Sequence, residues 1–162
     1  MKQHEIIKHI YILHFMLQGI QCCLDLNVVQ KVIPLTFIEK IPNSANYLVG
    51  IMNLSGISVP VLDLALRINL QHEKKYTLDT PIVICHDGIS DTGLVVDKIM
   101  GIELINEAAL QRHGNLSDMN SPVLGVIEIN HKLVLMLDVK TILDMSKSID
   151  NSTLVHKLTQ DG

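Results

Sequence analysis

The eight histidines of this sequence could bind a metal or transfer protons, because imidazole does both near neutral pH. No two of them form an HxH or HExxH motif, whereas zinc ligands recur at short, fixed intervals. We therefore expect no metal site and no cofactor. We expect His9 and His14 to line a polar strand face or to cover the β-structure. The histidines are His4, His9, His14, His72, His86, His113, His131 and His156.

The three cysteines are Cys22, Cys23 and Cys85, an odd number without CxxC spacing. The segment 1–16 is interrupted by charged residues and lacks the apolar run of a signal peptide. Together these features predict a cytoplasmic protein with reduced thiols. Cys22 and Cys23 should face opposite sides of a strand, as should Cys85 and His86, because side chains alternate along a strand.

Asp63 and Asp138 could form a carboxylate pair for acid–base catalysis, but each directly precedes a short apolar segment. A side-chain carboxylate in that position caps a helix by accepting hydrogen bonds from free amides of its first turn. The sequence has no Ser/His/Asp order, nucleophile elbow or phosphate-binding glycine loop. We therefore expect two N-caps, no catalytic residues and no enzymatic activity.

The charge, the aromatic content and the length of the apolar runs argue against nucleic-acid binding and against membrane insertion. The 162 residues carry 13 Lys plus Arg against 17 Asp plus Glu, with no Trp, two Phe and three Tyr. Nucleic-acid binders usually have basic stripes and aromatic stacking surfaces, so we expect no nucleic-acid partner. Every apolar run is shorter than the roughly 20 residues that a spanning helix needs, so we expect no direct membrane insertion.

Short Val-, Ile- and Leu-rich runs separated by turn residues predict a mainly β protein. Polar segments at 71–80 and 146–162 predict a boundary between two lobes and a C-terminal tail. Short helices are expected after Asp63, as far as Ile68, and after Asp138, as far as Leu143. The expected strands are 11–17, 21–26, 28–34, 47–54, 57–62, 81–86, an interrupted region at 92–105, 123–129 and 132–137.

The second half of the chain repeats the first at a constant interval. The interval that separates Gly50 from Gly125 also relates the pairs Leu54 and Ile129, Leu62 and Leu137, Asp63 and Asp138, and Ile68 and Leu143. A looser match relates 24–27 to 94–97 at a slightly shorter interval. Each half is too short to bury much surface alone, so we expect two similar β-lobes packed as one unit.

Three ordered motifs resemble the CheW-like domains. Residues 46–56, continuing into 59–64, are similar to the signature hairpin of that family. The segment 92–97, followed by 99–102, resembles its second signature. Gly125 and Val126, with 135–143, resemble its closing segment, so that the likeness runs from about Tyr11 to Leu143.

The resemblance implies two five-stranded SH3-like β-barrel lobes that share a hydrophobic seam. It implies one CheW-like domain at 1–145, with intertwined lobes at about 11–70 and 81–143, followed by the tail 146–162. Members are free coupling proteins or regulatory domains of CheA-type histidine kinases. This length leaves no room for kinase, phosphotransfer or receiver domains, so we expect the free adaptor. Its implied partners are the kinase regulatory domain and the cytoplasmic tip of a chemoreceptor.

Two residues depart from the family pattern. Lys31 stands where glutamate is common, and Ser55 stands where arginine is expected in the hairpin turn. One interpretation is neutral drift, because exposed ion pairs contribute only about 0–1 kcal/mol. The other is a joint change that adapts the surface to a different kinase or receptor. An arginine at position 55 would repel Lys31, and Ser55 removes that repulsion.

The candidate partner-binding residues lie around these two positions and in the second signature. A third of the apolar ones at the first hairpin, Leu54 included, are expected to face a partner and the rest the core. Val96 and Ile99 would line the groove between lobes that receives a receptor helix in the family. The candidates are Val29, Lys31, Val32, Ile33, Asn53, Ser55, Gly56, Ile57, Val96 and Ile99.

Two other functions remain open. One is a CheW-like adaptor of a specialised chemosensory system, for example one for twitching motility, and the Lys31 and Ser55 departures favour it. The other is a double barrel that binds a peptide or small molecule, which needs an apolar pocket with a few polar groups. The receptor, the kinase, the motility output and the oligomeric state are not determined by the sequence.

Overall fold

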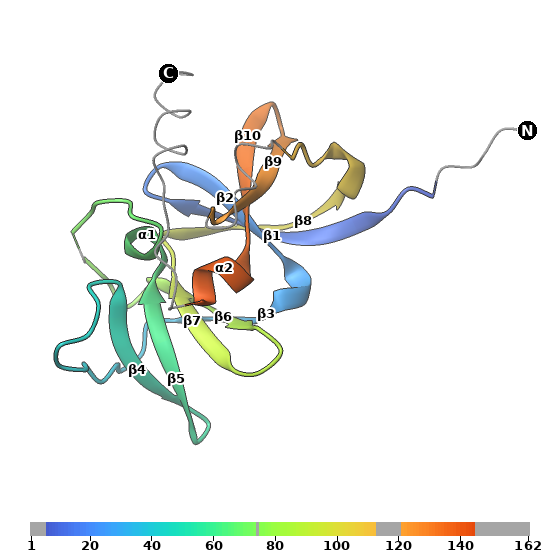
Figure 1. Ribbon diagram of the computed structural model, residues 1–162. Coiled ribbons are helices and arrows are strands. Elements are labelled where there is room, and N and C mark those ends of the chain that lie inside the picture. The colour runs from blue at the N-terminus through green and yellow to red at the C-terminus, as the bar shows by residue number, and fades with distance from the viewer. Residues whose placement is uncertain (1–5, 74, 113–120, 145–162) are drawn as a thin grey trace, which may run out of the picture.

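The computed structural model describes residues 6–73, 75–112 and 121–144. Ten strands form two five-stranded sheets, one above the other, with two one-turn helices between them (Figure 1). The first sheet has the order β8-β1-β2-β10-β9 and the second β3-β6-β7-β5-β4. The mainly β architecture predicted from the sequence is confirmed. The first sheet contains β1 (His9–Leu17), β2 (Ile20–Asp25), β8 (Lys98–Asn106), β9 (Val123–Ile129) and β10 (Lys132–Leu137).

The second sheet contains β3 (Val29–Pro34), β4 (Leu48–Leu54), β5 (Ile57–Asp63), β6 (Pro81–His86) and β7 (Asp91–Val95). The helices are α1 (Leu64–Arg67) and α2 (Val139–Leu143), and short 3-10 turns lie at Leu26–Val28 and Glu107–Ala109. No helix within the described part of the chain is long and apolar enough to cross a membrane.

The interrupted strand region expected at 92–105 is two strands in different sheets. β7 pairs with β5 and β6 of the second sheet, whereas β8 pairs with β1 of the first. The chain crosses between sheets at Val96 and Asp97, where the Asp97 carboxylate accepts a hydrogen bond from the Gln18 amide of the first sheet, 2.7 Å away. Each sheet therefore contains strands from both halves of the sequence. The domain and lobe boundaries stay predictions, and the predicted tail 146–162 lies outside the described residues.

The repeats seen in the sequence are confirmed in the strand pairing. β5 runs parallel to β7 with Val61 opposite Gly93, and β10 runs parallel to β2 with Met136 opposite Cys23. Val61 and Met136 are related by the longer repeat interval, and Cys23 and Gly93 by the shorter one, so both intervals describe equivalent places in the two sheets. Below, the hairpin–helix unit of the first copy is 48–68 and that of the second copy is 123–143.

Three apolar clusters hold the sheets together. A central cluster lies between the sheets and contains Phe15 of β1 and Cys85 of β6. A second cluster belongs to the first sheet and a third to the second sheet. Cys22 lies in the central cluster and Cys23 in the second, which confirms that they face opposite sides of β2. The inner strands are thus buried on both faces, which explains their continuous apolar sequence.

Both predicted helix caps are confirmed. The Asp63 carboxylate accepts a hydrogen bond from the Leu66 amide at 3.0 Å, and that of Asp138 accepts one from the Lys140 amide at 3.2 Å. The two helices meet through Arg67, whose Nε donates to the Ile142 carbonyl at 2.7 Å. Arg67 and Ile142 are equivalent residues of the two hairpin–helix units, so this contact lies where the two copies of the repeat face each other.

Candidate partner-binding surfaces

The edge strand β3 carries four of the predicted partner-binding residues. β3 pairs on one side only, with β6, which leaves its other edge unpaired within the second sheet. Lys31 and Val32 are exposed, Val32 by 40%, while Val29 and Ile33 are half-buried. Val29 packs against the central cluster and Ile33 against the cluster of the second sheet. Lys31 and Val32 are therefore the β3 side chains most open to a partner.

The turn between β4 and β5 carries the other four residues near the first signature. Ser55 and Gly56 have φ of 52° and 87°, the left-handed pair that a two-residue hairpin turn requires. The Asn53 side-chain oxygen accepts a hydrogen bond from the Gly56 amide at 2.8 Å, which fixes the turn. Ile57 follows with 61% of its surface exposed. Ile57 is an exposed apolar side chain next to a rigid turn.

β3 and the β4–β5 hairpin are at opposite edges of the second sheet, but the sheet curves around one core. Ile33 of β3 and Leu54 of β4 both pack against the third apolar cluster. Leu54 is half-buried, so part of its side chain contacts the core and part is exposed to solvent. We name the eight candidate residues on these elements the β3–hairpin surface. They are Val29, Lys31, Val32, Ile33, Asn53, Ser55, Gly56 and Ile57.

Val96 and Ile99, the two candidates in the second signature, lie deeper. Val96 is 1% exposed in the central cluster, and Ile99 is half-buried against that cluster. Val96 also lines a groove of about 390 Å³ between the sheets, together with Gln18 and Asp97. Ile99 is not among the residues that line this groove, so the expected groove with both Val96 and Ile99 in its wall stays a prediction.

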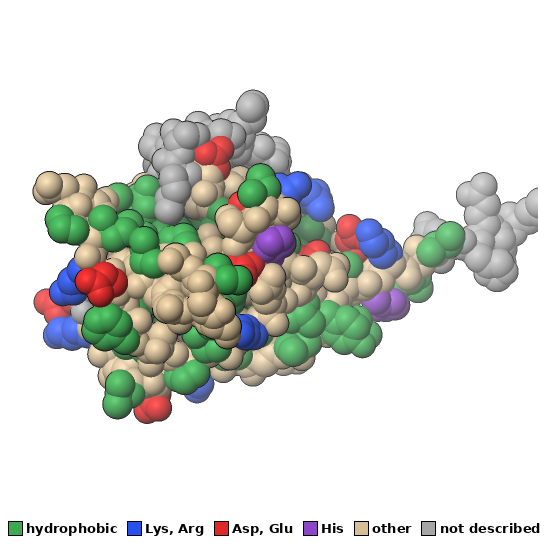
Figure 2. Space-filling model, turned by 90° about the horizontal axis from the view of Figure 1, so that it is seen from below, with side chains coloured by type: hydrophobic (Ala, Val, Ile, Leu, Met, Phe, Trp, Pro, Cys, Tyr) green, Lys and Arg blue, Asp and Glu red, His purple; other side chains and the backbone are tan. Residues whose placement is uncertain are grey.

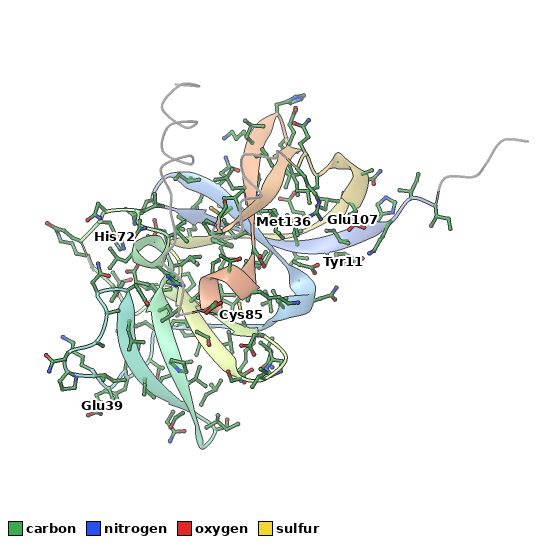
Figure 3. All side chains as sticks on the ribbon, in the orientation of Figure 1. Tyr11, Glu39, His72, Cys85, Glu107 and Met136 are labelled. Carbon is green, nitrogen blue, oxygen red and sulfur yellow. The ribbon has the colours of Figure 1, made fainter. Side chains whose placement is uncertain are left out.

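Asp63 also lines this groove. Its carboxylate is the centre of a hydrogen-bond network that was not predicted from the sequence. Its carboxylate is 2.8 Å from His72 Nε2 and accepts a hydrogen bond of 2.6 Å from the Tyr76 hydroxyl. His72 lies beside α1, in the polar connection 71–80 (Figure 3). Burial and the neighbouring carboxylate raise the pKa of Tyr76 well above its ordinary value, so the hydroxyl stays protonated as a donor. The network therefore fastens the connection to the domain.

Most described histidines contact carboxylates. His14 Nδ1 is 3.1 Å from Glu103 and its Nε2 is 2.9 Å from Gln21. His14 is buried and shares one face of the first sheet with the half-buried side chains of Glu103 and Gln21. His86 Nδ1 is 2.8 Å from Asp91. Among the residues that the structure describes, no group of three potential ligands could hold a metal ion.

An exposed apolar stripe on the edge strand β8 was also missed. Met100, Ile102 and Leu104 are 47%, 59% and 55% exposed, and Leu104 lies opposite the exposed Tyr11 of β1. The alternate row of this strand contains Gly101 and Glu103, so alternation alone favours Met100, Ile102 and Leu104 as the core-facing row, and the structure has them exposed. In the view from below, hydrophobic side chains form several separate groups rather than one patch (Figure 2).

Comparisons with known proteins agree with this architecture. Residues 11–147 match the model of the CheW-like domain. The chain is 24% identical to the chemotaxis protein CheW of Bacillus subtilis over 83% of this chain and 86% of the relative. It is 29% identical to CheW of Helicobacter pylori over 73% of this chain and 71% of that one.

A solved structure shows the same fold. The crystal structure of the scaffolding protein TtCheW from Thermoanaerobacter tengcongensis aligns with a TM-score of 0.78 and 25% identity, covering 88% of this chain and 98% of TtCheW. The family match spans both hairpin–helix units and both sheets described above. The chain therefore belongs to the CheW-like domain family.

Proposed function

We propose that this protein is a non-enzymatic chemotaxis scaffold that couples chemoreceptors to a CheA-type histidine kinase. The observation that carries the proposal is the match of residues 11–147 to the CheW-like domain, together with the two-sheet structure shared with a CheW scaffolding protein. The kinase regulatory domain and the cytoplasmic tip of the receptor are the proposed partners. The proposed location is the cytoplasm, where these partners meet.

The β3–hairpin surface is the proposed docking site for one of these partners. Its edge strand has unpaired backbone groups on one side, which suits strand addition or side-chain packing by a partner. Val32 and Ile57 supply exposed apolar area, and Lys31 supplies a positive charge. Lys31 makes no ion pair within the described part of the chain, so its charge is available to a partner.

The proposed mechanism is positional. Strands buried on both faces and a shared central cluster make the two sheets one block. Such a block transmits the relative position of two bound proteins without doing chemistry. The Asp63 carboxylate, the most deeply buried one described, is occupied by three donors, so it is not free to act as a catalytic base.

Binding to a kinase regulatory domain tests the proposal. We expect the two proteins to co-elute on a sizing column, and a receptor fragment to join them in the same peak. Calorimetric titration then gives the affinity with and without the receptor fragment. A folded protein that binds neither partner, but saturates with a small ligand, would show that the proposed function is wrong.

Lys31 and Ser55 support the variant in which the scaffold serves a specialised chemosensory system. If the pair sets partner choice, Lys31→Glu with Ser55→Arg should shift the preference from the cognate kinase domain toward a heterologous one, as measured by calorimetry. The matched control is Lys98→Glu with Asn130→Arg, which makes the same charge changes on the first sheet. Asn130 is the repeat equivalent of Ser55 in the second hairpin. Unchanged preference in the test variant would favour neutral drift.

A further inference from the structure

His14 is a buried titratable side chain with a hydrogen-bond partner at each ring nitrogen. Its strand, β1, lies between β2 and β8 in the first sheet (Figure 1). From β8, Glu103 Oε1 lies 3.1 Å from His14 Nδ1, and from β2, Gln21 Oε1 lies 2.9 Å from His14 Nε2. The imidazole therefore connects three adjacent strands through side-chain contacts.

The second sheet shows that the fold does not need a polar side chain at this place. His14 lies opposite Cys23 in the first sheet. In the second sheet, Ile84 lies opposite Gly93, which is the repeat equivalent of Cys23. Ile84 is therefore the equivalent of His14, and it is fully buried in the apolar cluster of the second sheet.

Glu103 also has an apolar equivalent in the other copy of the repeat. It corresponds to Ile33 at the shorter repeat interval. Glu103 lies opposite Ile12, two residues before His14, just as Ile33 lies opposite the residue two before Ile84. Ile33 packs against the same apolar cluster that contains Ile84. Two isoleucines thus fill in one sheet the place that an imidazole and a carboxylate fill in the other, so packing does not explain why His14 and Glu103 are polar.

The charged groups on this face of the first sheet favour a proton on the ring. On the face that carries His14, β8 contributes Glu103 and Lys98, and β2 contributes Cys23 and Asp25. Lys98 is exposed, whereas Glu103 and Asp25 are half-buried. Burial, and after it the carboxylates of Glu103 and Asp25, raise the pKa of Cys23 to about 12, so its thiol stays uncharged. The half-buried charges on this face are therefore carboxylates.

The other elements around the second apolar cluster contribute mainly apolar side chains. The 3-10 turn after β8 contributes Leu110, and Glu107 of the same turn pairs with Lys8 at 3.3 Å beyond the start of β1. From β9 and β10, the cluster receives Ile127, Ile129, Val134 and Met136. Glu103 is thus the charged group that contacts the ring directly.

Each charge state of the ring requires a different orientation of the Gln21 amide. A ring protonated at both nitrogens donates to Glu103 and to the Gln21 oxygen, which is the arrangement in the structure. A ring that has lost its Nε2 proton to water has an acceptor there, and the Gln21 side chain offers it a donor when its amide is reversed. We propose that His14 is a proton-dependent switch inside the first sheet, in which loss of the Nε2 proton reverses the Gln21 amide and converts the ion pair with Glu103 into a neutral hydrogen bond.

The switch acts on the attachment of β8. Hydrogen bonds between charged groups are roughly twice as strong as neutral ones, so the protonated ring holds Glu103 and its strand more firmly. β8 is an edge strand that pairs only with β1, and its other row of side chains exposes Met100, Ile102 and Leu104. Because imidazole changes its charge between about pH 5 and 8, we expect the opening of this exposed edge to follow pH in that range. The inference does not depend on the proposed kinase and receptor.

Nitrogen NMR of the histidine rings tests the switch in the full chain, between about pH 5.5 and pH 8.5. We expect both ring nitrogens of His14 to be protonated at the acidic end, and Nδ1 alone at the alkaline end. The Gln21 side-chain amide signals should move with the same midpoint. His14→Ile should abolish this movement, whereas the control His131→Asn, which removes a histidine whose side chain is 99% exposed, should leave it in place.

Hydrogen exchange measures the effect on β8. We expect the protection of the β8 amides that pair with β1, divided by that of the β3 amides that pair with β6, to fall severalfold from pH 6 to pH 8. The ratio cancels the intrinsic pH dependence of exchange. His14→Ile with Glu103→Ile copies the residues of the second sheet and should make the ratio constant. If this variant does not fold, Glu103→Gln keeps the hydrogen bond without the charge and should flatten the ratio as well.

Three results would overturn the inference. The first is a His14 ring that keeps its proton on Nε2, rather than on Nδ1, when it is neutral. The second is a set of Gln21 amide signals that do not move with the titration of His14. The third is a β8 ratio that falls as much in the variants as in the unmodified chain, because the pH dependence would then come from other groups.

Discussion

At the scale of single residues, the Asp63 carboxylate contacts three different residues. It caps α1 and joins α1 to the connection 71–80 through His72 and Tyr76. The Tyr76→Phe variant leaves Asp63 Oδ2 without its hydroxyl donor in a buried place, so we expect the free energy of unfolding to fall by about 1–3 kcal/mol. Tyr11→Phe, on an exposed ring, should change it by less than about 0.5 kcal/mol. Urea unfolding measures both, and equal effects would contradict the role of Tyr76.

The buried thiols make stability depend on alkaline pH. Burial raises the pKa of Cys23 and of Cys85 to about 12 from an ordinary value of 9.0, and it raises that of Cys22 further. The unfolded thiols ionise first, so their contribution is fully present below pH 9 and is lost as the pH rises toward 12. Each thiol should cost about 1.4 kcal/mol per pH unit in that interval.

Urea unfolding at pH 8, 9 and 10 measures this loss. Tyr76 has a raised pKa as well and contributes in the same direction above pH 10, so the comparison below pH 10 isolates the thiols. The same samples should react with iodoacetamide only after unfolding. A free energy of unfolding that stays constant from pH 8 to pH 10 would show that the thiols are not shielded as described.

At the scale of elements, two glycines allow loop backbone to pair with β4 and β9, the edge strands of the two hairpins. A Cβ on Gly50 would lie 2.2 Å from the Glu39 carbonyl oxygen, and one on Gly125 would lie 2.6 Å from that of Gln111. Glu39 lies beside β4 in Figure 3, where its backbone bridges Ile51. We expect Gly50→Ala to lower the free energy of unfolding by about 3–5 kcal/mol, because backbone atoms cannot move aside.

Gly101→Ala is the matched control for Gly50→Ala. The two glycines have φ of 145° and 152°, but a Cβ on Gly101 meets no atom within 4 Å. This control therefore carries the backbone strain without the clash, which costs about 1–3 kcal/mol. Thermal unfolding of both variants gives the difference. If the two cost the same, the close approach of Glu39 is not what requires Gly50.

The hairpin turns offer a second comparison between the copies. Gly56 and His131 are equivalent residues with φ of 87° and 63°, a conformation that costs a non-glycine residue about 1–2 kcal/mol. Because the turn is Asn130-His131, the His131→Gly variant creates the Asn-Gly pair that such turns prefer. We expect it to raise the melting temperature, and Gly56→His to lower it. Changes of the same sign in both variants would contradict this explanation.

At the scale of the whole molecule, Arg67 joins the two copies of the repeat. Its guanidinium is buried, donates to the Ile142 and Asp144 carbonyls at 2.7 Å, and lies 4.9 Å from the centre of the Tyr47 ring. We expect Arg67→Met to cost about 3 kcal/mol, because two helix-end carbonyls lose their donor. Lys98→Met, on an exposed side chain, should stay within about 0.5 kcal/mol. Chemical unfolding measures both, and a small effect at Arg67 would mean that the α1–α2 contact contributes little.

The sequence predicted the local features of the candidate surfaces and missed those that join distant segments. The Asp63 cap and the Ser55-Gly56 turn depend on neighbouring residues, and both were predicted correctly. His72 and Tyr76 were missed as partners of Asp63 because the polar connection 71–80 has no periodicity that shows which way its side chains point. The exposed stripe at Met100, Ile102 and Leu104 was missed because it is the more apolar row of β8, which alternation assigns to the core.

The sequence by itself determined the strands, the turns, the two helix caps and the internal repeat, because each rests on interactions within a short segment or on a direct match between two segments. Only the tertiary structure decided that β7 and β8 belong to different sheets, that Val96 is buried while Val32 is exposed, and that Arg67 meets Ile142. These outcomes depend on pairing and packing between segments far apart in the chain. The repeat shows that the two hairpin–helix units match in sequence. How the two units contact each other is decided only when they pack together in the folded chain.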